Sequence, residues 1–71
     1  MKKRITYILE GEYIELIKLL KVLHISESGG QAKMMVDDGL VTLNGRTEFR
    51  KRAKLRAGDT INIFGQTIVI K

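Results

Sequence analysis

Apolar residues recur at two spacings along the chain, and the change of spacing separates predicted strands from predicted helices. Residues 4–9 alternate between two faces as in a β-strand, whereas residues 12–23 carry an apolar stripe with the period of an α-helix. That stripe consists of Tyr13, Leu16, Ile17, Leu20 and Leu23. After a connector from His24 to Glu27, a second helix is predicted over residues 29–38. The strands expected to follow are residues 41–43, 46–49, 60–64 and 67–70.

Individual residues mark the ends of the second helix and the turn of the hairpin that follows it. Ser28 is a favourable N-cap, and Gln31 can complete a capping box by bonding back to it. Gly39 suits the left-handed conformation that ends many helices. Asn44-Gly45 is typical of a two-residue hairpin turn in which both residues have positive φ. We expect the buried face of this helix to consist of Ala32, Met35, Val36 and Gly39.

The order of these elements predicts an α+β fold. Two small helices would pack on one face of a mostly antiparallel sheet, and the N-terminal strand would join the strands from the end of the chain. A chain of 71 residues suits a single domain, residues 1–71, with a small core. We expect Tyr13 and Phe64 in that core. A Gly65-Gln66 turn would connect the last two strands, because glycine is favoured at the first position of a type II′ turn.

Positive charge is concentrated in one segment, residues 46–56, which we call the basic segment. The formal net charge of the chain is +5, and this segment alone accounts for it, with six cations and one acid, Glu48. Residues 50–56 are too charged for a buried element, so an exposed loop or irregular strand is expected. Such a field attracts polyanions, although the segment could instead be a solvated loop that keeps the protein soluble. The cations are Arg46, Arg50, Lys51, Arg52, Lys54 and Arg56.

The start of the second helix is another candidate for binding anions. Backbone N–H groups are free at a helix N-terminus, and Gly29-Gly30 would leave room for a phosphate to approach them, with Lys33 one turn further on. The alternative is that the two glycines only ease the chain into the helix. Phe49 lies inside the basic segment and is the aromatic residue best placed in the sequence to stack on a base.

The composition argues against an enzyme, a metal site and a membrane span. The chain has no cysteine, and its one histidine, His24, has no neighbouring cluster of metal ligands. Asp37-Asp38 is expected on a solvated face, with Asp37 paired to Lys33 one turn earlier. No apolar run approaches the roughly 20 residues that a transmembrane helix needs. We therefore expect a soluble cytoplasmic protein with no cofactor, no metal and no small-molecule substrate.

Several short motifs occur in a fixed order: the helix of residues 12–23, Ser28 to Ala32, Gly39, Val41, Leu43, Asn44-Gly45 and Gly58-Asp59-Thr60-Ile61. Together they resemble the RNA-binding domain named after small-subunit ribosomal protein four. The resemblance spans about residues 12–63 and is strongest for small free-standing bacterial members of the YaaA and YbcJ kind. It implies the αL RNA-binding motif, two helices followed by a β-hairpin, with added strands at both ends. One departure is Gly29, since the family often has arginine after the capping serine.

The resemblance implies a non-catalytic RNA-binding protein. Its expected target is structured ribosomal RNA or a ribosome-assembly particle, held in a basic groove between the start of the second helix and the hairpin. The residues alone leave open an adaptor module that docks on an acidic protein partner, and a DNA-binding protein, because both nucleic acids carry phosphates. The residues expected to contact RNA are Ser28, Gly29, Gly30, Lys33, Arg46, Phe49, Arg50, Lys51, Arg52 and Lys54.

Overall fold

The computed structural model describes residues 3–71, so Met1 and Lys2 of the predicted domain lie outside it. Neither helix of this described part is long and apolar enough to cross a membrane. In chain order the elements are β1 Lys3–Tyr7, β2 Ile14–Glu15, α1 Leu16–Val22, α2 Gly29–Asp37, β3 Thr42–Leu43, β4 Arg46–Thr47, β5 Lys54–Leu55, β6 Thr60–Ile63 and β7 Gln66–Ile70.

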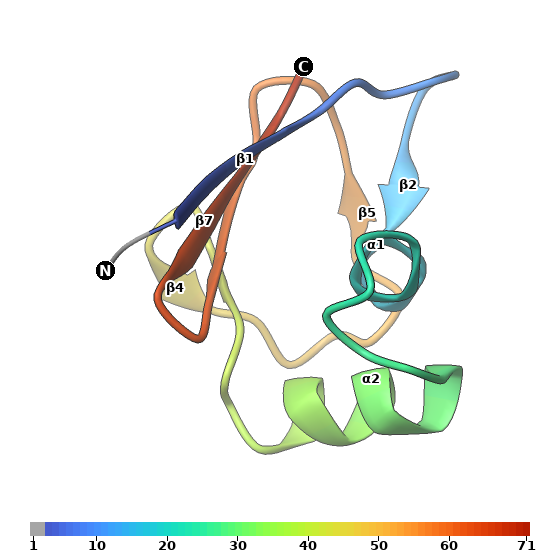
Figure 1. Ribbon diagram of the computed structural model, residues 1–71, viewed down its shortest axis with the longest axis vertical. Helices are drawn as coiled ribbons and strands as arrows, with labels where there is room; N and C mark the ends of the chain where they lie inside the picture. The colour runs from blue at the N-terminus through green and yellow to red at the C-terminus, as the bar shows by residue number, and fades with distance from the viewer. Residues whose placement is uncertain (1–2) are drawn as a thin grey trace.

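Five of these strands form one sheet in the order β1-β7-β6-β3-β4, and β2 and β5 form a separate two-stranded ribbon (Figure 1). β1 runs parallel to β7, with Ile5 opposite Ile68. The pairings β3–β4, β3–β6, β6–β7 and β2–β5 are antiparallel. The predicted α+β class is therefore confirmed, and so is the pairing of the N-terminal strand with the end of the chain.

The core lies between the five-stranded sheet and the two helices (Figure 1). Strand alternation places every second residue of β6 and β7 on the buried face, because successive side chains point to opposite faces of a sheet. The helices bury three residues each against this face, and such burial contributes about 1.5–3 kcal/mol per large side chain. The residues concerned are Ile61, Ile63, Ile68 and Ile70 of the sheet, Leu16, Leu19 and Leu20 of α1, and Ala32, Met35 and Val36 of α2.

The first helix begins at Leu16, four residues later than predicted. Ile14–Glu15 instead form β2, and the Glu15 side chain makes no capping hydrogen bond. The first N–H groups of α1 donate to carbonyls of the basic segment: Leu16 to Ala53 at 2.9 Å and Ile17 to Lys51 at 3.2 Å. The sequence could not show this boundary, because an apolar residue at every second position fits the end of a strand as well as the start of this helix.

Two aromatic residues expected in the core lie at the surface instead. Tyr13 is 41% exposed and Phe64 is 59% exposed. Tyr13 precedes β2 rather than lying within a helix, so its side chain has no place in the helical stripe. Phe64 forms the turn between β6 and β7 with Gly65, and both residues have positive φ, +51° and +75°. The predicted Gly65-Gln66 turn is therefore one residue too late, because Gln66 already pairs in β7.

Both helices end in a Schellman motif, in which a residue in the left-handed conformation lets two N–H groups reach back to the last carbonyls. In α2 that residue is Gly39, with φ +73°, as predicted. In α1 it is His24, with φ +59°, which the sequence does not indicate because glycine is the usual residue there. In α2 the N–H groups of Gly39 and Leu40 donate to the carbonyls of Val36 and Met35, respectively. In α1 the N–H groups of His24 and Ile25 donate to the carbonyls of Lys21 and Leu20.

The turn between β3 and β4 is the predicted Asn44-Gly45 pair, with φ values of +50° and +87°. The Asn44 side chain also fastens this turn to the start of β6. Its Nδ2 donates to Asp59 at 3.0 Å, and its Oδ1 accepts the N–H of Thr60 at 2.9 Å. The hairpin is thus anchored to the sheet at its tip as well as through the pairing of β3 with β6.

Candidate nucleic-acid interface

The amino end of α2 presents backbone donors to solvent. Ser28 is the N-cap, and its Oγ accepts the N–H of Gln31 at 3.1 Å. The Gln31 side chain accepts from the N–H of Glu27 rather than from that of Ser28, so the predicted capping box is displaced by one residue. Among residues 3–71 no protein group accepts from the N–H of Gly29 or Gly30. These two donors remain available for an anion at the positive end of the helix dipole.

Neither packing nor backbone conformation requires glycine at the start of α2. A Cβ added to Gly30 would meet only the Ser28 hydroxyl, at 3.9 Å, and neither Gly29 nor Gly30 has positive φ. Gly39 is different, because its φ is +73° and a Cβ there would lie 3.5 Å from the Phe49 ring. The two glycines therefore leave open space over the free N–H groups, as the phosphate-binding prediction requires.

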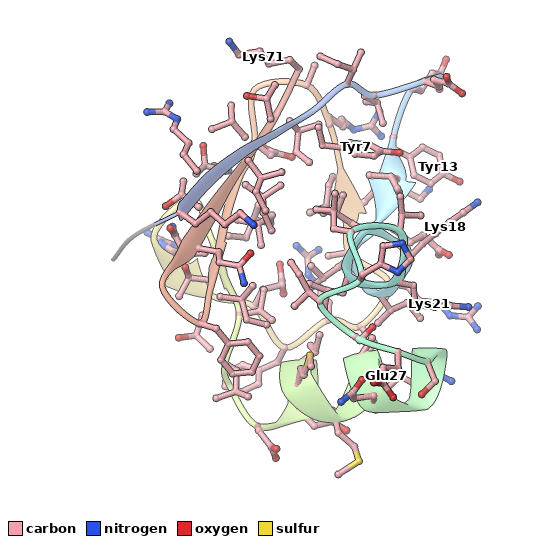
Figure 2. All side chains as sticks on the ribbon, viewed as in Figure 1. Tyr7, Tyr13, Lys18, Lys21, Glu27 and Lys71 are labelled. Atoms are coloured by element: carbon pink, nitrogen blue, oxygen red, sulfur yellow. The ribbon has the colours of Figure 1, made fainter. Side chains whose placement is uncertain are left out.

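Two lysines supply charge near this end of α2. Lys33, which is exposed, lies on α2 itself. Lys21 comes from α1, and its Cδ lies 3.9 Å from the position that a Cβ on Gly29 would occupy. Figure 2 shows Lys21 on the ribbon of α1 and Glu27 where α2 begins. Lys21 is not among the residues predicted from the sequence, although the short connector that brings the two helices together indicates its position.

Residues 50–56, expected as an exposed loop or irregular strand, contain a short strand and two buried residues, so the basic segment is part of the fold. Ala53 is 4% exposed and Leu55 is fully buried, and Lys54–Leu55 form β5 against β2. Because side chains alternate along a strand, burial of Ala53 and Leu55 directs Arg52, Lys54 and Arg56 outward. This alternation was not predicted from the sequence, because the many charged residues of the segment argued against a buried strand. The cations are consequently attached to a backbone that the core holds in place.

Arg50 is oriented by a carboxylate within the same segment. Its Nε and Nη2 donate to the two carboxylate oxygens of Glu48 at 3.1 and 2.9 Å, and its backbone N–H donates to the same group at 3.0 Å. The guanidinium of Arg50 thereby lowers the pKa of Glu48 and has its own pKa raised. The Arg50 side chain is still 76% exposed, against 12% for Glu48. Its remaining N–H donors can therefore reach a phosphate.

Lys51 connects the basic segment to α2, but at the carboxyl end of that helix. Its Nζ lies 3.2 Å from Oδ1 of Asp37, the last residue of α2. The predicted pairing of Asp37 with Lys33 is therefore wrong within the described residues, because Asp37 pairs with Lys51. The amino and carboxyl ends of a helix of this length are about 12 Å apart. Lys51 consequently lies away from Gly29 and Gly30.

The other cations of the segment form no ion pair within residues 3–71. Arg46 lies in β4, at one edge of the sheet, and is exposed. Lys54 and Arg56 lie over the ring of Tyr13, with Nζ 4.9 Å and Cζ 5.8 Å from its centroid. Arg52 is exposed beside them in the sequence. The cations of the basic segment therefore lie in three places: the carboxyl end of α2, the hairpin and the β2–β5 ribbon. The sequence had led us to expect all of them in one groove with the amino end of α2.

Phe49 is available for stacking but also has a structural contact. Its side chain is 61% exposed, and its ring lies against Gly39 and the turn that ends α2. A second exposed apolar residue, Met34, lies on α2 and is 65% exposed. Phe49 therefore presents an aromatic surface next to Arg50, as the stacking prediction requires.

Three of the acidic residues, and the histidine, have structural contacts. Asp59 accepts from the Arg56 N–H at 2.8 Å and from Asn44, and Glu48 and Asp37 accept from Arg50 and Lys51. His24 forms the turn after α1. Within residues 3–71 no three His, Asp or Glu side chains come close enough together to hold a metal ion.

Comparison with known proteins gives consistent matches over most of the chain. The model of the S4 domain family matches residues 7–71. The chain is 41% identical over 58 residues to "Putative RNA-binding protein YbcJ" of Escherichia coli (strain K12), which covers 82% of the chain and 83% of that protein. The same values hold for "Uncharacterized protein YbcJ" of Shigella flexneri. The solution structure of E. coli YbcJ, described as revealing an αL motif involved in RNA binding, superposes with a TM-score of 0.72 and 38% identity, covering 99% of this chain and 90% of that one.

Proposed function

The chain belongs to the S4 domain family, and on this premise we propose that it is a non-catalytic protein that binds structured RNA. The relative in E. coli carries RNA binding in its name, and the description of its structure attributes that function to the αL motif. The same elements, two helices followed by the β3–β4 hairpin, are present here. The identity to that relative, 41%, supports extending the function to this chain.

The observation that carries the proposal is the way the basic segment is built. Buried Ala53 and Leu55 fix its backbone, and the carbonyls of Lys51 and Ala53 cap α1. A mobile cationic loop would lose conformational entropy when it bound a polyanion, whereas this segment is ordered before binding. Its exposed cations therefore form a surface of fixed shape, which suits recognition of a folded RNA.

Two kinds of donor would hold the phosphates. The amino end of α2 offers the backbone N–H groups of Gly29 and Gly30 with Lys33 nearby, and the basic segment offers guanidinium and ammonium groups. Arginine binds phosphate with two parallel hydrogen bonds, and each cation that neutralises a phosphate releases a counterion. The RNA would be recognised by its shape and by any unpaired bases, because phosphate contacts carry no sequence information.

The target class within this proposal is ribosomal RNA or a ribosome-assembly particle in the cytoplasm. Its support is the resemblance of the chain to a domain named after a ribosomal protein. The dispersed placement of the cations is compatible with such a target, because a folded RNA presents phosphates in several directions around the protein. Crosslinking in cells, followed by sequencing of the bound RNA, identifies the target directly.

The experiment that tests RNA binding compares two triple variants that remove the same charge. Lys33→Ala, Arg46→Ala and Arg52→Ala together remove three cations that form no ion pair within the described residues. Lys3→Ala, Arg4→Ala and Lys71→Ala remove three cations from β1 and the end of the chain. Affinity is measured on a structured RNA and on a DNA hairpin of the same sequence, at one fixed salt concentration.

We expect the first triple variant to bind RNA roughly 10- to 100-fold more weakly and the second to bind almost as wild type does. Equal loss in both variants would show attraction by net charge alone. Equal affinity for RNA and DNA would contradict recognition of RNA as such. Absence of any RNA binding, with capture of one acidic protein that survives nuclease treatment, would favour the adaptor alternative.

A further inference from the structure

The β2–β5 ribbon presents an aromatic ring together with two cations on its outer face. Ile14 and Leu55 are paired and buried, so alternation places Tyr13, Lys54 and Arg56 on the opposite, exposed side. The Lys54 Nζ and the Arg56 Cζ lie 4.9 and 5.8 Å from the centre of the Tyr13 ring. Neither cation forms an ion pair with another residue in the range 3–71, so both are free to bind a phosphate.

A cavity of about 520 Å³ opens beside this ring. The residues that line it include Tyr7, Tyr13, Ile14 and Val22, so it offers apolar and aromatic surface that suits a flat aromatic ligand. Figure 2 shows Tyr7 and Tyr13 at the same end of the molecule, with Lys18 on α1 next to them. The residues come from β1, β2 and α1, so this cavity is separate from the amino end of α2 and from the β3–β4 hairpin.

Charged groups of both signs lie at the cavity and beside it, as a nucleotide with a base and a phosphate requires. Glu10 and Glu15 line the cavity together with Lys18, and the two carboxylates can only accept hydrogen bonds, so they suit the N–H groups on the edge of a base. Lys54 and Arg56 do not line the cavity, but they lie over the ring of Tyr13, which does, and they suit the phosphate. Lys54 is the cross-strand partner of Glu15. An anion alone would meet the two carboxylates unfavourably, and an apolar ligand would leave all five charges unused.

We infer that this cavity binds one unpaired nucleotide of the RNA, with its base against Tyr7 and Tyr13 and its phosphate on Lys54 and Arg56. The inference rests on the proposed function and adds a single-stranded contact that the αL elements do not supply. Glu10 and Glu15 accept from the base, so adenine, cytosine and guanine, which carry exocyclic amino groups, bind more tightly than uracil.

Binding to two RNA hairpins that share one duplex tests the inference. One hairpin is blunt and the other carries a single-stranded tail of adenosines. Wild type is expected to bind the tailed hairpin about tenfold more tightly, because a base stacked on an aromatic side chain adds affinity of this order. Tyr13→Ala is expected to remove that gain and leave affinity for the blunt hairpin unchanged, whereas Tyr13→Phe keeps the ring and most of the gain. The matched control is Phe64→Ala, which removes an exposed aromatic from the β6–β7 turn.

The two hairpins also separate failure of this inference from failure of the proposed function. Equal wild-type affinity for both RNAs would overturn the single-stranded contact while RNA binding stands. No affinity for the blunt hairpin would overturn the proposed function itself. In a second measurement, AMP is expected to shift the NMR signals of the Tyr7 and Tyr13 rings, and inorganic phosphate at the same concentration is expected to leave those of Tyr7 in place. Identical spectra with and without AMP would also overturn the inference.

Discussion

The amino end of α2 and the basic segment both offer groups that suit phosphate, but the fold uses them in opposite ways. At the amino end of α2 the donors are backbone N–H groups, and Gly29 and Gly30 contribute almost nothing to the packing. In the basic segment the donors are side chains, while the backbone caps α1 and Ala53 and Leu55 belong to the core. The N–H groups of the first region are therefore accessible because few atoms pack against them. The cations of the second region are accessible because the opposite face of the segment is buried in the core.

Because of this difference, stability and binding are separable at the amino end of α2 and coupled in the basic segment. A side chain added at Gly30 would change what approaches the backbone and leave the core intact. In the basic segment the burial of Ala53 and Leu55 sets the direction of the cations, so a substitution of either residue would affect both folding and binding. The predictions below test this contrast from the largest expected effect to the smallest.

Leu55→Ala is expected to be the most damaging single change. Leu55 is fully buried, and replacing a buried leucine by alanine costs about 2–5 kcal/mol of unfolding free energy. A domain of this size has only modest stability, so much of the protein would be unfolded at 37 °C. Urea denaturation measures the loss, with Leu40→Ala, at a leucine that is 42% exposed, as the control. Equal and small losses in both variants would show that the basic segment is a loop without a core contact.

Ser28→Ala removes the N-cap of α2 and is expected to cost about 1 kcal/mol. Ser28→Asp keeps a capping acceptor, so its stability should stay near that of wild type. The added carboxylate should nevertheless weaken RNA binding, because it places negative charge where a phosphate would lie. Thermal unfolding and RNA affinity are measured for both variants. Wild-type affinity in Ser28→Asp would remove the amino end of α2 from the binding surface.

Gly30→Ala is expected to change stability and affinity in opposite directions. Alanine fits the open space, and replacing a helical glycine by alanine stabilises by about 0.5–1 kcal/mol. RNA affinity should fall, because the methyl group lies over the free N–H groups. Met34→Ala, at an exposed position of the same helix, is the control. A more stable variant with unchanged affinity would indicate that the glycines serve only to start the helix.

The pair between Glu48 and Arg50 is expected to give the smallest effect, visible as a pH dependence. Arg50 lowers the pKa of Glu48, so the pair contributes stability above the ordinary glutamate pKa of about 4.3, and this contribution is lost as the pH falls through the lowered value. Arg50→Ala should therefore reduce the melting temperature at pH 7 and make little difference at an acidic pH below the lowered pKa of Glu48. The same reduction at both pH values would mean that Arg50 stabilises the fold through packing and not through this pair.

The two ends of α2 could be predicted from the sequence because their signals are local. The capping serine, the glutamine three residues later and Gly39 all act within one or two turns of the helix. The Asn44-Gly45 turn is local in the same sense. The exception is the hydrogen bond that the Glu27 N–H donates to the Gln31 side chain, because it depends on how the connector enters the helix.

The arrangement of the basic segment could not be predicted because it depends on a partner far away in the chain. β5 exists only through its pairing with β2, about 40 residues earlier, and the same pairing shortens α1 and exposes Tyr13. The ion pair between Lys51 and Asp37 likewise depends on the tertiary fold. Six cations in eleven positions predict a charged surface, but their directions follow from the burial of Ala53 and Leu55.

The salt dependence of RNA affinity tests the central claim most directly, because it counts the phosphates that the protein neutralises. With about five contacts, the logarithm of the affinity should fall with the logarithm of salt concentration at a slope of about −3.5 to −4.5. The triple variant Lys33→Ala, Arg46→Ala and Arg52→Ala should make that slope shallower by about 2 to 3. A wild-type slope near zero, or a slope that the three substitutions leave unchanged, would contradict RNA binding through the basic segment and the amino end of α2.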